Sequence, residues 1–199
     1  MKAGSIRHAV GGILALPILV GVALAHVTPP VVLTSDRDAV LGLLAGTRRF
    51  FVREVRLLPE ERDAIHRQSG WRPSEEFYRF YLGRDEEGRL VATAIFMTEF
   101  TIHGPLRVAV GIAPDGKIRG ATVVELTEET YAWVKALIDQ DFVRDYVGQD
   151  SRARFGLSDR LVRAHLADMP QFYAQVIASL IQRGAILYEV TVLKRGGRQ

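Results

Sequence analysis

The sequence predicts an α+β domain in which helices pack on a twisted antiparallel sheet. Between residues 77 and 126, apolar side chains recur at every second position, which is the period of a strand with one buried face. Short turn signals, such as Pro114-Asp115-Gly116, separate these runs, so neighbouring strands are expected to pair antiparallel. Helical periodicity precedes and follows this stretch, and 199 residues suit one domain with an ordinary core.

Composition excludes several classes of protein. The chain has no Cys, which rules out a disulfide framework, a thiolate zinc site, a cysteine-ligated iron–sulfur cluster and covalent c-type haem. The excess of 26 Lys and Arg over 23 Asp and Glu lies at the two ends, because residues 26–193 carry 21 basic and 23 acidic side chains. Without a basic stripe on a folded element, nucleic acid is not an expected partner.

The first 27 residues predict export. Lys2 and Arg7 precede a run of 17 uncharged residues from Ala9 to Ala25, which ends in the small-x-small pattern Ala-Leu-Ala. This is typical of a secretory signal cleaved after Ala25, or of a short retained membrane anchor, which is the preferred interpretation. Either way the positive end stays in the cytoplasm, and the remainder lies on the periplasmic side of a bacterial inner membrane.

A retained anchor is expected to pack against other helices. Gly12, Leu16 and Leu19 follow helical spacing on one face. Because a glycine lets a neighbouring backbone approach closely, this face predicts contact with other membrane helices.

The elements of the first half are predicted from caps and periodicity. Ser35 is a suitable helix N-cap, and Pro59 stands where the first residue of a helix tolerates proline. The expected order is a linker over 28–34, a helix over 36–45, a strand over 50–58 with Phe51 on its apolar face, and a helix over 60–68 closed by Gly70.

The second half is expected to build the sheet and then cover it. The strands are predicted at 77–83, 90–99, 106–112 and 117–126. Helices follow from Thr127 or Thr130 to about 141, from Ser158 to about 167 and from Pro170 to about 183. A closing strand over 185–193 and a basic tail over 194–199 complete the prediction.

One stretch resembles a known family. It reads Gly104-Pro105-Leu106-Arg107-Val108-Ala109-Val110-Gly111-Ile112, then Pro114-Asp115-Gly116-Lys117-Ile118, then Val123-Val124-Glu125-Leu126-Thr127-Glu128-Glu129-Thr130. It is similar to the FMN-binding domain of the periplasmic, membrane-anchored flavoproteins in Rnf and Na⁺-translocating NADH:quinone reductase complexes. The resemblance covers most of residues 35–190, and it implies an FMN-binding-domain-like periplasmic domain over 35–193.

The chain departs from this family where the flavin would be attached. The family carries FMN on a Thr hydroxyl in a Gly-Ala-Thr motif before the final helix, but the matching residues 164–171 contain no Ser, Thr or Gly. Without an acceptor oxygen no phosphoester forms there. Gly120-Ala121-Thr122 spells the tripeptide inside an expected strand, where the family has ordinary sheet residues.

The resemblance still implies a place for a non-covalent flavin. It would lie near His103, Gly104, Glu129 and Thr130, with Arg107, Arg144 and Arg152 as possible phosphate partners. The acidic residues around Glu128 and Asp141 are read as compensation of a helix dipole rather than as a metal site. No Gly-rich phosphate loop, HExxH or GxSxG motif is present, so an independent enzyme is not expected.

Two functions follow. The preferred one is a non-catalytic, membrane-anchored periplasmic accessory subunit of a respiratory or photosynthetic electron-transfer complex, whose partners are the other subunits and which needs no cofactor. The alternative is a periplasmic electron carrier that binds FMN non-covalently.

Overall fold

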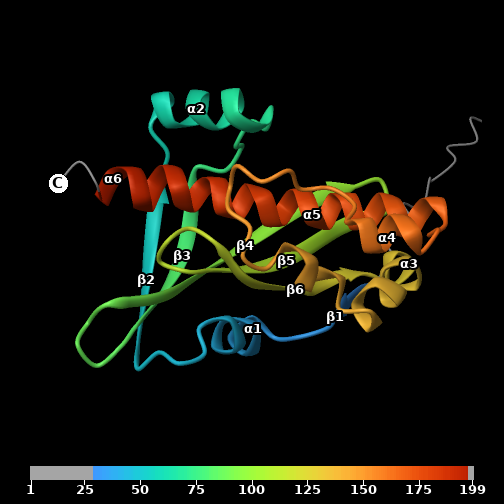
Figure 1. Cartoon of the computed structure of the whole chain (residues 1–199), viewed down its shortest axis with the longest axis horizontal. Helices are drawn as coiled ribbons and strands as arrows, with labels where there is room; N and C mark the ends of the chain where they lie inside the picture. The colour runs from blue at the N-terminus through green and yellow to red at the C-terminus, as the bar shows by residue number, and fades with distance from the viewer. Residues whose placement is uncertain (1–28, 197–199) are drawn as a thin grey trace, which may run out of the picture.

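The structure is a computed structural model and describes residues 29–196. Its centre is a six-stranded sheet in the order β1-β6-β5-β4-β3-β2, and every neighbouring pair is antiparallel. Helices pack on both faces of this sheet (Figure 1). The predicted α+β class is therefore confirmed.

The strands are β1 (Pro30–Val32), β2 (Arg49–Arg56), β3 (Phe77–Arg84), β4 (Leu90–Thr101), β5 (Gly104–Ile112) and β6 (Ile118–Thr127). The helices are α1 (Asp36–Leu43), α2 (Pro59–Ser69), α3 (Glu128–Asp139), the 3₁₀ helix η1 (Phe142–Tyr146), α4 (Asp159–Arg163), α5 (Asp168–Tyr188), the π-helix η2 (Glu189–Leu193) and α6 (Lys194–Gly196).

The predicted caps are confirmed. The side chains of Ser35, Thr127 and Ser158 accept hydrogen bonds from backbone N–H groups in the first turns of α1, α3 and α4. Pro59 begins α2, and Gly70 ends it in the left-handed conformation at φ +73°. Local sequence signals thus determine where these helices begin or end.

Helix α5 is the centre of the main core. Its buried face includes Tyr173, Ile177 and Ile181, which pack on the strands from one side. A Cβ added at Gly184 would lie 3.3 Å from both Ile95 and Val110, so the glycine lets the helix lie close to the sheet. On the other face, α1 packs through a smaller cluster that contains Ala39.

The predicted closing strand over 185–193 is wrong. These residues continue the last helix through Tyr188 and then form η2. Their apolar and β-branched side chains suggested a strand. Because most of these residues are buried, apolar and polar residues do not alternate with the period of either a strand or a helix. No turn signal separates them from the helix, and the Thr191 hydroxyl donates to the Leu187 carbonyl oxygen at 2.6 Å.

Part of the expected linker is a strand. Pro30, Val31 and Val32 pair with Thr127, Leu126 and Glu125 at the edge of the sheet. The two prolines suggested an unpaired tether, but an edge strand tolerates proline because one side of its backbone has no partner.

Strands β3 and β4 separate along their length. They pair only between Phe80↔Ile95 and Arg84↔Leu90. Beyond this point residues 96–101 of β4 pair with β5 alone, and residues 77–79 of β3 pair with β2 alone. Strands β2 and β3 therefore form an arm that diverges from the other four strands (Figure 1).

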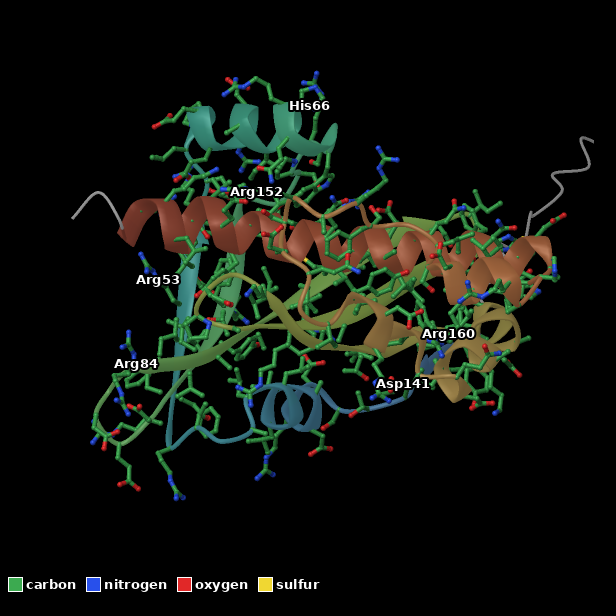
Figure 2. All side chains as sticks on the ribbon, viewed as in Figure 1. Arg53, His66, Arg84, Asp141, Arg152 and Arg160 are labelled. Carbon is green, nitrogen blue, oxygen red and sulfur yellow. The ribbon has the colours of Figure 1, made fainter. Side chains whose placement is uncertain are left out.

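Much of this arm is exposed. Phe50, Phe51 and Val52 are 47–60% exposed, so the prediction that Phe51 faces a core is wrong. Phe50, Phe51 and Val52 border an open pocket shared with α1, whereas Val55 further along the strand is buried against the main core. Figure 2 shows Arg53 beside β2, pointing away from the body of the molecule, and His66 on the outer helix α2.

Within the described residues, one helical stretch is long and apolar enough to cross a membrane. It runs from Asp168 to Gly196 with a mean hydropathy of 1.5, and 67% of its apolar window is buried in the fold, as expected of a core helix. The predicted anchor over 1–27, with Gly12, Leu16 and Leu19, lies outside the described residues, as do the last three residues of the basic tail.

Candidate functional site

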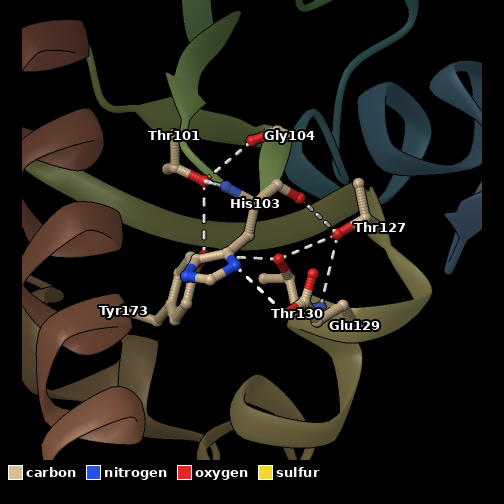
Figure 3. A network of polar contacts seen from close by, with 7 residues as sticks. All are labelled: Thr101, His103, Gly104, Thr127, Glu129, Thr130 and Tyr173. Carbon is tan, nitrogen blue, oxygen red and sulfur yellow. Dashed lines mark hydrogen bonds and ion pairs between the residues drawn. The ribbon is translucent and has the colours of Figure 1, made fainter. Parts of the chain in front are cut away.

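The four residues predicted for a flavin lie together at one end of the sheet. His103 lies in the tight connection between β4 and β5, Gly104 begins β5, and Glu129 and Thr130 lie in the first turn of α3. Figure 3 shows these residues joined by polar contacts with Thr101, Thr127 and Tyr173. Antiparallel pairing brings the β4–β5 turn next to the start of α3, because β5 begins beside the end of β6 and α3 follows β6 directly.

The hydroxyl of Thr101 holds the β4–β5 turn. It donates to the Gly104 carbonyl oxygen at 2.9 Å and accepts from the His103 backbone N–H at 3.2 Å. Its single proton is then used, so the Tyr173 hydroxyl, 3.3 Å away, donates to it. A side chain of α5 therefore fixes a turn at the far end of β4.

The hydroxyl of Thr127 joins the same turn to α3. It donates to the His103 carbonyl oxygen at 2.8 Å and accepts from the backbone N–H of Thr130 at 3.3 Å. The Thr130 hydroxyl lies 2.9 Å from the Thr127 hydroxyl and 3.4 Å from the Tyr173 hydroxyl, so it connects the cap of α3 to α5. Both threonines are buried, and each has its hydrogen bonds satisfied within the chain.

The His103 ring is enclosed by an acid and two aromatic rings. Its Nδ1 lies 3.1 Å from Oε1 of Glu129. The ring packs edge-on against Trp133 at 4.8 Å between centroids, and Trp133 stacks on Tyr173 at 5.7 Å. The sequence analysis did not include Trp133, although it follows Thr130 by three residues on α3 and helical spacing therefore puts it on the same face. No signal in the sequence linked Tyr173 to this site.

Gly104 is required by the backbone. Its φ is +99°, and a Cβ added there would lie 2.5 Å from the Thr127 methyl carbon. Any larger residue would both strain the turn and displace the threonine that joins it to α3. We call this set the turn network: Thr101, His103, Gly104, Thr127, Glu129, Thr130, Trp133 and Tyr173.

A second feature lies where β3 and β4 separate. This groove has a volume of about 610 Å³, and its walls are aromatic and arginine-rich. It is lined by Trp71, Arg72, Ser74, Glu75, Phe77, Tyr78, Arg79, Tyr81, Phe96, Met97, Thr98, Glu99, Phe100, Arg107 and Arg183. We call it the β3–β4 groove.

Arg183 of α5 forms the base of the β3–β4 groove. Its guanidinium pairs with Glu99 and lies 5.3 Å from the centre of the Trp71 ring. Among the described side chains, three buried polar atoms have no close hydrogen-bond partner: Arg183 Nε and the Tyr78 hydroxyl at the groove, and the Thr93 hydroxyl elsewhere on β4. Burial raises the pKa of Tyr78 to about 12. The groove thus holds unsatisfied polar groups, unlike the turn network.

The three arginines predicted to bind a phosphate are not brought together. Arg107 on β5 binds Asp36 of α1 through two hydrogen bonds of 2.6 and 2.8 Å. Arg152 lies 3.8 Å from Glu189 of η2, on the opposite side of the sheet from α1 (Figure 2). Arg144 is exposed on η1. The three side chains therefore lie too far apart to form one phosphate site together, because spacing in the sequence did not reveal the face on which each lies.

The acidic residues near α3 have ordinary roles. Glu128 and Glu129 lie in the first turn of the helix, where negative charge is favourable, and Lys135 pairs with Asp139 at 2.5 Å. Within residues 29–196 no group of three or more His, Asp or Glu side chains is arranged to hold a metal.

No family model matches the sequence, and no curated protein is similar to it at a significant level.

Proposed function

We propose that this chain is a non-catalytic accessory subunit of a membrane electron-transfer complex, held on the periplasmic side of a bacterial inner membrane by its N-terminal segment. We further propose that residues 35–193 are an FMN-binding-domain-like domain without a resident cofactor. The family resemblance of residues 104–130 motivates the choice of complex, and the apolar run Ala9–Ala25 motivates the location.

The turn network carries the proposal. The resemblance would place a flavin beside His103, Gly104, Glu129 and Thr130, but there the chain's own groups bind one another. The rings of Trp133 and Tyr173 are stacked together, so neither offers that shared face to a flavin. A non-covalent flavin needs both a surface for its ring and free donors for its phosphate. This arrangement supports a structural role for the region where the resemblance would place the flavin.

The β3–β4 groove provides a surface for a partner subunit. Aromatic and arginine side chains, which line it, contribute most to binding at protein interfaces. Residues 96–101 of β4 have no strand on their groove side, so their backbone can accept an extended segment. We propose that an extended segment of another subunit of the complex occupies this groove.

Purification of the tagged full-length chain from its native membranes tests the proposal. It should bring down companion membrane subunits that carry redox cofactors. Arg72→Glu, at an exposed position in the groove, should reduce their recovery several-fold. Arg53→Glu makes the same charge change at an exposed position outside the groove and should leave recovery unchanged. A chain that is purified alone from these membranes contradicts the proposal.

The convergence of His103, Gly104, Glu129 and Thr130 favours one alternative, an electron carrier with non-covalent FMN. A visible spectrum of the native protein separates the two functions. Flavin absorbance that is released on denaturation would establish the carrier. Its absence from protein isolated under native conditions would leave the accessory subunit.

A further inference from the structure

The end of β4 and the turn that follows it carry the most exposed large apolar side chains of residues 29–196. Ile102 is 94% exposed and Phe100 is 76% exposed. Phe172 of α5, 44% exposed, lies across a groove of about 470 Å³ from them. Exposed apolar groups that gather at one place in this way mark a contact surface.

We call residues 100–103 the β4–β5 tip, and the fold holds this tip in place. Thr101 and Tyr173 of the turn network bind the turn on its inner side, as described above. Glu99 next to the tip is paired with Arg183, and His103 is paired with Glu129. The tip therefore presents apolar side chains while its nearest charged groups are engaged with each other.

The described chain begins at the same end of the sheet. Pro30 pairs with Thr127, and the Pro29 carbonyl oxygen accepts a hydrogen bond from the Glu128 backbone N–H. Because β1, β6, β5 and β4 are neighbours, the start of β1 and the tip of β4 are separated by three strand spacings, about 15 Å. Helix α6, near the C-terminus, lies at the opposite end (Figure 1).

The tether to the apolar run is short. Only His26, Val27 and Thr28 stand between Ala25 and the first described residue. Three extended residues span about 10 Å. If the run Ala9–Ala25 is a membrane anchor, this end of the domain stays within about that distance of the bilayer.

We propose that the β4–β5 tip rests on the lipid bilayer, with Phe100 and Ile102 inserted among the lipids of the outer leaflet. The inference rests on the membrane anchor of the proposed function, and it fixes the orientation of the domain. The partner is the lipid itself, because apolar side chains beside an anchoring point meet the membrane first. Phe100 stands at the end of the β3–β4 groove nearest the tip, so the remainder of the groove is left for the neighbouring subunit.

The absence of Cys makes the test direct. Ile102→Cys and Val52→Cys each give the full-length chain one thiol for an environment-sensitive fluorophore. Val52 is 60% exposed on β2 and serves as the matched control. In phosphatidylcholine vesicles, quenching by aqueous iodide should be several-fold weaker at position 102 than at position 52. Nitroxide-labelled lipid should quench position 102 alone.

The outcomes separate the two proposals. Equal iodide quenching at both positions, with the chain retained in vesicles after an alkaline wash, overturns the lipid contact but leaves the anchor intact. Release of the chain by that wash overturns the anchor and the contact together. Protection of position 102 only in native membranes with companion subunits shows that a protein covers the tip, which also overturns the lipid contact. Circular dichroism of each variant checks that the fold is kept.

Discussion

The turn network and the β3–β4 groove both combine aromatic rings with buried polar groups, but they differ in whether those polar groups have hydrogen-bond partners inside the chain. In the turn network the hydroxyls of Thr101, Thr127 and Thr130 have partners inside the chain. In the β3–β4 groove the Tyr78 hydroxyl and Arg183 Nε are buried without one. Buried polar groups contribute to stability when they are satisfied and destabilise the fold when they are not. The turn network is therefore expected to stabilise the fold, while the groove leaves polar groups for the partner contact that we propose.

The largest effect should come from removing the ring that joins α5 to the β4–β5 turn. Tyr173 is fully buried, stacks on Trp133 and binds Thr101. Tyr173→Ala should reduce the free energy of unfolding by about 3–5 kcal/mol, because it leaves a cavity and frees the turn. Urea denaturation measures this. Phe77→Ala, at a half-exposed ring of the groove, is the control and should cost less than about 1 kcal/mol. Equal losses would contradict the distinction between the two regions.

The second effect concerns the backbone of the turn. Gly104→Ala combines a φ of +99° with a Cβ 2.5 Å from the Thr127 methyl, and it should cost about 3 kcal/mol. Gly88→Ala is the matched control, because its φ is +82° and no atom lies within 4 Å of the added Cβ. It should cost about 1–2 kcal/mol. Thermal unfolding of the two variants separates the steric clash from the strain, and a similar cost for both would show that the contact with Thr127 does not matter.

A smaller effect is expected at the cap of α3. Thr127→Val keeps the shape of the side chain but removes the hydroxyl that caps α3 and binds the His103 carbonyl. The expected loss is about 1–2 kcal/mol. Thr127→Ser retains the hydroxyl and should recover most of that stability. If the serine variant is as unstable as the valine variant, the methyl packing against Gly104 is the important part.

Sequence reasoning identified the elements that local signals define. Ser35, Pro59, Gly70 and Thr127 each act through neighbouring residues, and the helices they delimit were predicted correctly. The four residues of the candidate flavin site also came together, because hairpin pairing follows from short turns.

What the sequence did not reveal depends on tertiary packing. The apolar run 185–193 is helical because it continues a helix that is buried on all sides, so its pattern had no period to read. Tyr173 reaches the turn from 72 residues away in the sequence, and Arg107 and Arg152 lie on opposite faces of the sheet. The separation of β3 and β4 that opens the groove depends on where pairing stops, which strand patterns do not encode.

The smallest effect at neutral pH distinguishes the two regions most directly. Tyr173→Phe should cost about 1 kcal/mol, since it removes the donor to Thr101. Tyr78→Phe should leave stability within about 0.5 kcal/mol, because the Tyr78 hydroxyl loses only a weak contact with the Glu75 backbone.

The same variant changes the response to alkali. Burial raises the pKa of Tyr78 from 10.0 to about 12, so the unfolded chain loses this proton at a lower pH than the folded one. The contribution of Tyr78 to stability is therefore complete below pH 10 and is lost as the pH rises toward 12. Urea titrations from pH 7 to 11.5 should show a shallower alkaline loss in Tyr78→Phe than in the parent chain. Tyr146 and Tyr188, whose pKa values burial also raises to about 12, remain in both chains and keep part of the dependence of the unfolding free energy on pH.

One outcome would contradict the distinction between the two regions. An unchanged dependence on pH, together with a loss of more than about 1 kcal/mol at neutral pH, would mean that the Tyr78 hydroxyl is as well hydrogen-bonded within the fold as the hydroxyls of the turn network.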